Sequence, residues 1–437
     1  MKIIPAPQTD LSRFQKPDPE LEVLYGMPRD VRFCRLCNMS NQQPMSSNEY
    51  LHTKNSSKST IAFDDSGICH ACRFNHLKED GTIDWAEREK ELIALCDQYR
   101  RDDGSYDCIV GGSGGKDSAM QSHLLKYKYG MHPLTVTWSP HLYSDIGWKN
   151  FQNWLHIGGF DNYLFTPNGK IHRLLTRNAT LNLLHPFQPF IMGQKTFVSK
   201  MAAQFNIPLI FYGEMPGEYG EQISHNTSNY AASPEKTESE GFQLDYLAGK
   251  DVRDAYLGGK SVGEYMDEGV PLAELKSYLP MDPDVLRRKG IDFKYLGYYV
   301  RWVPQEAYYY AVDNTGFEAN PVRTEGTYSK YNSIDDKIDG FFYFTRWIKF
   351  GVGRAMMDSA QEIRNHHITR EEGLSLMKRY EGEYPARFEK EFLHYVGMTR
   401  EEFFETCDRF RSPHLWKVED GEWKLRHTPW DGSNSLA

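Results

Sequence analysis

The sequence predicts an α/β protein with a doubly wound, mostly parallel sheet, preceded by a cysteine-containing module and followed by a mainly helical region. Three observations lead to this prediction. Short apolar runs alternate with helical patterns over residues 84–225, a glycine-rich turn joins the first run to a helix, and two CxxC pairs precede both. Strands that alternate with helices form parallel βαβ units. We therefore expect three regions, at residues 1–83, 84–225 and 226–437.

Composition narrows the class of protein. The 437 residues include 51 Lys and Arg against 60 Asp and Glu, which gives a formal net charge of −9. Proteins that bind nucleic acid need a clustered excess of basic residues, so the net negative charge argues against nucleic-acid binding as the main function. No run approaches the ~20 apolar residues of a membrane helix, and the N-terminus lacks the apolar core of a signal peptide. We expect a cytoplasmic protein without membrane insertion.

The first region combines an irregular, proline-containing lead-in with four of the seven cysteines, Cys34, Cys37, Cys69 and Cys72. Two CxxC pairs supply four soft ligands, the typical set for a tetrahedral Zn²⁺. Because all four ligands come from protein, the site is predicted to be structural; reduced thiols or an iron–sulfur cluster are the alternatives. Within the insertion between the cysteine pairs, the polar stretch at residues 38–60 is expected to be a long surface loop. The other cysteines, Cys96, Cys108 and Cys407, are expected to be buried hydrophobic residues.

The second region carries the alternating pattern. A helix is expected after Asp84, which can cap its N-terminus, with Glu87 completing a capping box. Strands are expected at residues 106–110, 134–138, 162–165 and 207–212, and helices at residues 117–129 and 194–205. After residue 225 the alternation is lost: a Ser/Thr/Glu-rich stretch at 226–240 resembles a linker. The last hundred residues are expected to be helical, with capping boxes at Thr369/Glu372 and Thr399/Glu402.

The strongest chemical signal is the run GGSGGKDS at residues 111–118, between an expected strand and an expected helix. Glycines let the backbone turn tightly and bring its N–H groups near phosphate oxygens, and the helix adds the positive end of its dipole. It is no Walker A loop, because Val110 stands where glycine is required and Asp117 follows Lys116. The run predicts a phosphate-binding loop; an ordinary Gly–Ser loop is the alternative.

Two further segments are candidates for the same site. Glu214, in the run YGEMPGEYG at the presumed end of a late strand, could ligate Mg²⁺, because ligands collect beyond the carboxyl ends of parallel strands. Glu218 is a second candidate there, and a solvated acidic turn is the alternative. By the same geometry, Trp138 and Ser139 are candidates for the adenine side of a nucleotide site.

The segment from Gly316 to Asp339 mixes polar, charged and aromatic residues with glycine and has no clear periodicity. Such a loop can offer hydroxyl partners and flat apolar faces to a sugar or a nucleotide, although a plain surface loop has the same composition. The candidate substrate residues in it are Arg323, Tyr328, Lys330, Asp335 and Asp336.

The order SGGKDS resembles the pyrophosphate loop of the PP-loop ATP pyrophosphatases, which cleave ATP between its α and β phosphates and transfer AMP to a substrate oxygen. The resemblance implies that Lys116 and Asp117 are catalytic, that Lys116 adds positive charge, and that Asp117 helps to place Mg²⁺. The implied loop residues for ATP are Gly112, Ser113, Gly114, Gly115, Lys116, Asp117 and Ser118.

Together with the cysteine pairs, the runs GFEANPVRTEGTYSKYNSIDDKIDG, GRAMMDSAQEIR and RSPHLWK resemble the N-acetyl sugar amidotransferases of bacterial surface-polysaccharide biosynthesis, the family that serves lipopolysaccharide O-antigens. The likeness extends from about Cys34 to Trp416. It implies conversion of an acetamido group on a nucleotide-activated sugar into an acetamidino group. An amide oxygen is a poor leaving group, so ATP adenylylates it before ammonia displaces AMP.

The chain lacks the marks of its own glutaminase: Lys2 follows the initiator where an N-terminal nucleophile would require cysteine, and no cysteine lies in a GxCxG turn. It therefore resembles the synthetase subunit that works with a separate glutaminase and a cyclase-like barrel subunit. The rival is a PP-loop tRNA-modifying thiolase, which predicts a basic surface and further reactive cysteines. A nucleotide sensor without turnover is a third possibility. The sugar remains open between diacetamido uronic acids and nonulosonic acids.

Overall fold

The computed structural model describes residues 9–45, 48–53, 55–221, 246–247 and 249–431. The linker expected at residues 226–240 lies outside them. A five-stranded sheet in the order β3-β2-β1-β4-β7 forms the centre, and all four neighbouring pairs are parallel. This confirms the doubly wound parallel sheet. Its strands are β1 (Cys108–Gly111), β2 (Pro133–Trp138), β3 (Asn162–Phe165), β4 (Leu209–Tyr212) and β7 (Asp292–Tyr295).

Strand order fixes where a ligand can bind. The chain enters at β1, moves outward through β2 and β3, and returns to the other side of β1 with β4. Such a reversal leaves a crevice at the carboxyl ends of β1 and β4. Strand β7 was not expected from the sequence. It is a short DFKY run that pairs with β4, with Leu209 opposite Asp292.

Both faces of the sheet are covered by helices, as a doubly wound fold requires. Ile109 and Ile210 face a core that includes α6, whereas Cys108, Val110 and Phe211 face a core that includes α2. The helices of this part are α2 (Trp85–Tyr99), α3 (Lys116–His123), α4 (Asp145–His156), α5 (Gly169–Leu183) and α6 (Gln188–Phe205). The helix expected at residues 117–129 is divided, because a π-helical turn, Leu124–Lys128, follows α3.

Helix ends largely follow the expected caps. Asp84 accepts hydrogen bonds from the backbone of the first turn of α2, but Glu87 does not close a capping box and instead pairs with Lys90. The expected boxes at Thr369/Glu372 and Thr399/Glu402 are both present.

The C-terminal region is mainly helical, as predicted, and ends in a two-stranded hairpin. Its elements are α12 (Pro304–Thr315), α13 (Asp339–Phe350), α14 (Arg354–Arg364), α15 (Arg370–Tyr380), α16 (Glu389–Val396), α17 (Arg400–Arg409), β8 (Trp416–Glu419) and β9 (Glu422–Leu425). Between β4 and α12 lie short pieces: β5 (Tyr256–Leu257), β6 (Lys260–Ser261), α8 (Val262–Asp267), α9 (Leu272–Leu275), α10 (Pro283–Arg288) and α11 (Leu296–Tyr299).

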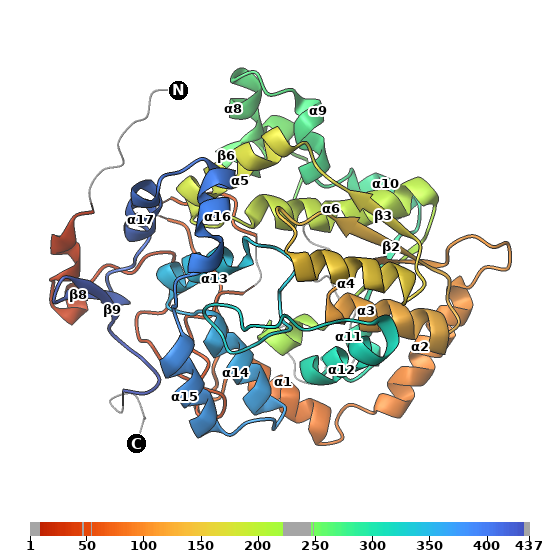
Figure 1. Cartoon of the computed structure of the whole chain (residues 1–437), viewed down its shortest axis with the longest axis horizontal. Helices are drawn as coiled ribbons and strands as arrows, with labels where there is room; N and C mark the ends of the chain where they lie inside the picture. Colours follow the sequence, from red (N-terminus) through yellow and green to blue (C-terminus); the bar gives the residue numbers. More distant parts are fainter. Residues whose placement is uncertain (1–8, 46–47, 54, 222–245, 248, 432–437) are drawn as a thin grey trace.

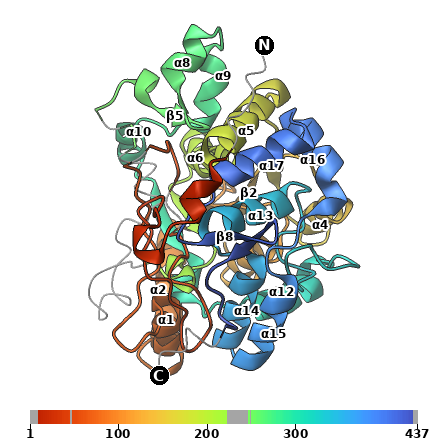
Figure 2. The ribbon, with the colours of Figure 1, turned by 90° about the vertical axis from the view of Figure 1, so that its left-hand side faces the viewer.

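The cysteine module packs against the far end of the chain. Its helix α1 (His70–Glu79) follows Cys69, and the four cysteines share a hydrophobic core with Met356 and Ala360 of α14 and Met377 of α15. Figures 1 and 2 show α1, α14 and α15 together at the base of the molecule, opposite α8 and α9. Among the described residues, every helix is too short or too polar to cross a lipid bilayer.

Candidate functional site

The glycine-rich loop has the predicted setting, between the end of β1 and the start of α3 at Lys116. Its compactness depends on Gly112, where an added Cβ would lie 2.3 Å from the Cβ of Ser118. The Ser118 hydroxyl donates to the carbonyl of Gly115 at 3.0 Å and so braces the loop from within. The N-terminus of α3 therefore presents open backbone N–H groups beside the loop, which is the geometry of a phosphate site.

This loop opens into a cavity of about 370 Å³ at the crevice between β1 and β4. Several parts of the chain build the walls, among them Gly147 and Asn150 of α4. Residues 113–117 form one wall, Glu214 and Tyr219 follow β4, and residues 331–364 close the opposite side. The edge of the cysteine module contributes Met39, Gln43, Ile61 and Ala71.

Carboxylates gather on the loop side of the cavity. Asp117 pairs with Lys116 at 2.6 Å, and Glu214 accepts a hydrogen bond from the Tyr219 hydroxyl at 2.6 Å. Burial raises the pKa of Glu214, and the nearby charge of Asp117 raises it further. A cation between these two carboxylates would relieve both effects. Among the described residues, the four cysteines alone gather three or more possible metal ligands within 4.8 Å of one another.

Asp335 joins the loop to the C-terminal wall. Burial raises the pKa of Asp335, while a hydrogen bond between its side chain and Ser113 lowers it in part. The contact depends on Gly147 of α4, where an added Cβ would lie 2.4 Å from the Cα of Asp335. The first turn of α4 therefore holds Asp335 against the phosphate loop.

One face of α14 forms much of the opposite wall. Arg354, Asp358, Gln361 and Arg364 follow one another at helical spacing, and all line the cavity. Arg354 lies 3.6 Å from Asp358, and its guanidinium is 4.5 Å from the centre of the Tyr343 ring. Its buried Nη1 has no hydrogen-bond partner among the described residues. This wall therefore directs positive charge and aromatic surface toward the loop.

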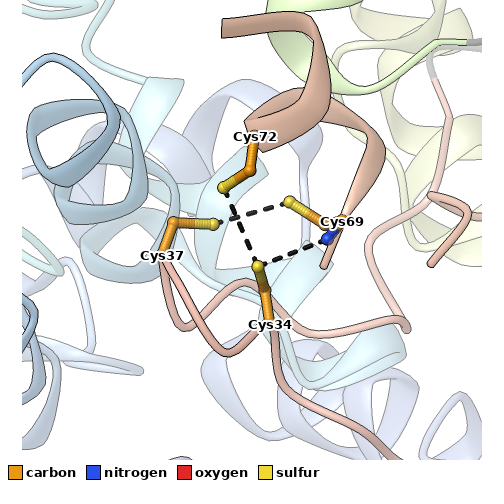
Figure 3. Close-up of side chains that lie close together, drawn as sticks. All are labelled: Cys34, Cys37, Cys69 and Cys72. Atoms are coloured by element: carbon orange, nitrogen blue, oxygen red, sulfur yellow. Dashed lines mark hydrogen bonds between the residues drawn. The ribbon is translucent and has the colours of Figure 1, made fainter. Parts of the chain in front are cut away.

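The four cysteines point toward one another (Figure 3), and they pack against Met356 and Ala360 of α14. The sulfur atoms of Cys34 and Cys72 lie 3.8 Å apart, and those of Cys37 and Cys69 lie 3.6 Å apart. Four thiolates at about 2.3 Å from one tetrahedral ion would be about 3.8 Å apart, so the set fits a single ion. A multi-iron cluster would stand between the sulfurs and separate them further.

Arg364 connects this cluster to the cavity. Its Nη1 lies 3.7 Å from the sulfur of Cys37, and its Nη2 donates to the carbonyl of Glu218 at 3.2 Å. Burial alone would lower the pKa of Arg364, but negative charge on Cys37 and Cys72 outweighs it and raises that pKa. The guanidinium therefore partly balances the charge of the thiolates.

The structure brings together some of the predicted nucleotide residues. Those that line the cavity are Ser113, Gly114, Gly115, Lys116, Asp117 and Glu214. Gly112 and Ser118 support the loop from behind. Trp138 and Ser139 are not among the described lining residues: both are buried, and the indole packs against Gly193 of α6. Cys96, Cys108 and Cys407 are fully buried.

Of the five predicted substrate residues, only Asp335 lines the cavity. Arg323 forms a bidentate pair with Glu383, at 2.6 and 2.8 Å, and Lys330 is exposed with its ammonium on a backbone carbonyl. The hydroxyl of Tyr328 is buried without a partner among the described residues. Asp336 accepts from the His141 ring at 2.8 Å and from the His141 backbone N–H at 2.6 Å. These contacts fold the 316–339 loop rather than face the cavity.

Most of the wall formed by α13 and α14 consists of residues that the sequence did not predict as site residues. The cavity-lining residues of this wall include Tyr343, Arg346, Arg354, Asp358 and Arg364. A signal existed: polar residues at positions i, i+4, i+7 and i+10 of the run RAMMDSAQEIR mark one polar face of a helix otherwise rich in Ala and Met.

Comparisons with known proteins address the C-terminal region most directly. Residues 325–428 match the family model described as "LPS biosynthesis protein WbpG-like, C-terminal domain". The match covers about a quarter of the chain and supports, for this region, a likeness to proteins of lipopolysaccharide biosynthesis. Among curated proteins, an uncharacterised protein of Methanocaldococcus jannaschii is 34% identical over 86 residues, which are 20% of this chain and 30% of that protein. The chain thus spans less than a third of that relative.

Among solved structures, an NMN synthetase from Francisella tularensis is 12% identical, with a TM-score of 0.25. The match covers 55% of this chain and 89% of the synthetase chain. The U34-tRNA thiolase NcsA from Methanococcus maripaludis, solved with its [4Fe-4S] cluster, is 12% identical, also with a TM-score of 0.25, over 76% and 88%. Scores of this size do not establish a shared fold, so the topology described above rests on the strand register of this chain.

Proposed function

We propose that the chain is an ATP-dependent sugar amidotransferase, the synthetase subunit that forms an acetamidino group, because residues 325–428 match the WbpG-like family model of lipopolysaccharide biosynthesis proteins. One observation carries the proposal. The phosphate loop at residues 113–117 and the family-matched residues 331–364 line the same cavity. A polysaccharide-biosynthesis domain that faces an ATP loop is suited to activate a sugar with ATP.

In the proposed reaction the loop and the start of α3 hold the phosphates of ATP through backbone N–H groups. Lys116 adds the positive charge that stabilises the departing pyrophosphate. Asp117 and Glu214 would hold Mg²⁺ together with phosphate oxygens and water, and the ion would neutralise charge on the phosphates. Two carboxylates suffice for Mg²⁺, because the nucleotide supplies further ligands.

The sugar enters opposite the loop, along the polar face of α14. Its acetamido oxygen attacks the α-phosphorus of ATP, the bond to the bridging oxygen breaks, and pyrophosphate leaves with that electron pair. Ammonia then adds to the activated carbon, the carbon–oxygen bond breaks, and AMP departs with the former amide oxygen. The sum converts amide, ATP and ammonia into amidine, AMP and pyrophosphate. Arg354 lies where it can hold a negatively charged group through this exchange.

The metal of the four-cysteine site is proposed to be Zn²⁺ in a structural role. The sulfur separations of 3.6 and 3.8 Å suit one tetrahedral ion, and four protein ligands leave no position for a substrate. Ammonia is proposed to come from a separate glutaminase, together with a cyclase-like barrel subunit. Free ammonium should therefore replace the partners in an assay.

The test is to incubate the chain with ATP, Mg²⁺, high ammonium and a panel of UDP-linked diacetamido uronic acids and activated nonulosonic acids. Mass spectrometry should detect a product about 1 Da lighter than the sugar, because NH replaces O, in equal amount to AMP. A Lys116→Ala variant should lose product, whereas Lys330→Ala, which changes an exposed residue outside the cavity, should retain it. AMP formation stimulated by unmodified tRNA, with no sugar product, would favour the thiolase instead.

A further inference from the structure

A second cavity of about 240 Å³ adjoins the cavity beside residues 113–117, which is the nucleotide cavity of the proposed function. The two share one wall, formed by Gln43, Tyr219, Phe342, Arg346 and Met357. The floor of the second cavity comes from α6 and α13 and from the insertion between the cysteine pairs. A ligand in the second cavity would therefore lie beside the nucleotide and within reach of it.

The second cavity is strongly basic in a chain of net charge −9. Lys58, Lys195, Arg346 and Lys349 line it, and Glu49 is the one carboxylate among its described lining residues. Lys58 and Lys349 share the single charge of Glu49, and Arg346 adds a further cation to this lining. His185 also lines the cavity, but burial lowers its pKa to about 3, so it is neutral and can accept a hydrogen bond.

Glu49 is already neutralised. It forms ion pairs with Lys349 and, at 3.3 Å, with Lys58, and it accepts a hydrogen bond from His52 at 2.8 Å. Burial lowers the pKa of Lys349 to about 8, although the negative charge of Glu49 acts to raise it. The carboxylate therefore cannot serve as counter-charge for the rest of the cavity.

Arg346 has no such partner. No carboxylate of the described residues lies within ion-pair distance of its guanidinium, and its Nη1 contacts the sulfur of Met357. Its Nε is inaccessible to solvent and has no hydrogen-bond partner among the described residues. Burial lowers the pKa of Arg346 to about 10, so it is still charged at neutral pH. An enclosed, unpaired guanidinium is unfavourable unless an anion completes it.

We propose that this second cavity binds an oxyanion of the acceptor, the diphosphate or the carboxylate of a nucleotide-linked sugar, with Arg346 as its principal ligand. The inference rests on the proposed function, since it places the acceptor beside ATP. With the anionic group in the second cavity, the sugar can extend past Tyr219 and Phe342 into the nucleotide cavity. The local excess of positive charge also resolves how a net-acidic chain holds two anionic substrates.

The test measures binding without turnover. The full chain is saturated with α,β-methylene-ATP and Mg²⁺, so that the phosphate loop is occupied, and titrated calorimetrically with UDP or, separately, with glucuronate. Arg346→Gln should weaken the binding of one of these probes at least tenfold, and Arg346→Lys should recover part of it. Affinity for α,β-methylene-ATP should stay the same. Lys330→Gln, a charge removed outside both cavities, should leave both affinities unchanged.

If Arg346→Gln weakens the binding of UDP, the second cavity holds the diphosphate. If it weakens the binding of glucuronate, the cavity holds the carboxylate. Equal affinity of parent and Arg346→Gln for both probes would overturn the inference. An equal loss of α,β-methylene-ATP binding would also overturn it, because Arg346 would then belong to the ATP site. If Arg346→Gln fails to fold, Lys195→Gln applies the same criterion. If the probes bind at Arg346 but no amidine product forms, the proposed function is wrong and this site stands. If the parent and Arg346→Gln form product equally well, this site is wrong and the proposed function stands.

Discussion

Replacing Lys78 by Met tests how the cysteine module is held to the cavity beside the glycine-rich loop. Lys78 lies on α1, and its ammonium is 2.6 Å from a carboxylate oxygen of Glu218 and 2.9 Å from the carbonyl of Trp302. The side chains of the pair are only 1% and 6% exposed. Glu218 belongs to the short helical turn Pro216–Tyr219, which also carries Tyr219 into the cavity. The ion pair therefore joins the module to the site.

The size of the effect follows from burial. Lys78→Met leaves the buried Glu218 without its ion-pair partner, and breaking a buried pair in this way costs about 3–5 kcal/mol. An unfolding entropy of about 2.1 cal/mol/K per residue gives roughly 0.9 kcal/mol/K for a chain of this length, so the expected fall in Tm is about 3–5 °C. The double variant Lys78→Met/Glu218→Gln removes the orphaned charge and should recover more than half of the loss.

Urea denaturation and differential scanning calorimetry of the parent, both single variants and the double variant provide the measurement. The matched control is Lys90→Met, because Lys90 pairs with Glu87 on the exposed surface of α2 and should not change stability measurably. A single Lys78→Met variant as stable as the parent would refute the reasoning. So would a double variant no more stable than the single one, since the orphaned charge would then not be the cause.

Three further predictions follow from buried contacts. Burial lowers the pKa of His414 to about 4, below its unfolded value of about 6.5. The contribution of neutral His414 to the free energy of unfolding is therefore complete above pH 6.5 and is lost as the pH falls toward 4, by up to about 3 kcal/mol. In curves of stability against pH, His414→Gln should reduce this loss. Gly147→Ala should displace Asp335, lower stability by about 1–3 kcal/mol and weaken α,β-methylene-ATP binding, whereas Gly169→Ala, where an added Cβ meets nothing within 4 Å, should not. Cys34→Ser should lower the bound zinc measured by mass spectrometry together with Tm, and full zinc occupancy in that variant would remove Cys34 from the site.

The parts of the fold that could be predicted are those in which local sequence and tertiary packing agree. The apolar runs around Val110 and Ile210 mark buried parallel strands, and the loop between β1 and α3 follows from glycines placed after such a run. Strand β7 could not be predicted in the same way, because its half-buried DFKY run has no strong pattern and gains its pairing from β4.

The candidate site likewise combines residues that a local motif reveals with residues that only tertiary packing brings in. Residues of the phosphate loop are adjacent in sequence, so a motif reveals them. The opposite wall comes from α13 and α14, more than two hundred residues away. Only the packing of α14 on the cysteine module turns Arg354 and Arg364 toward the loop. Arg323 and Lys330 have the residue types of a substrate site, but Glu383 and a backbone carbonyl engage them elsewhere.

The most direct test of the central claim follows the oxygen atom of the acetamido group. The sugar is labelled with ¹⁸O at that position and converted with ATP, Mg²⁺ and ammonium, and the released AMP and pyrophosphate are analysed by mass spectrometry. Adenylylation of the amide oxygen predicts one ¹⁸O in each AMP and none in pyrophosphate. Unlabelled AMP, or cleavage of ATP to ADP and phosphate, would contradict the account.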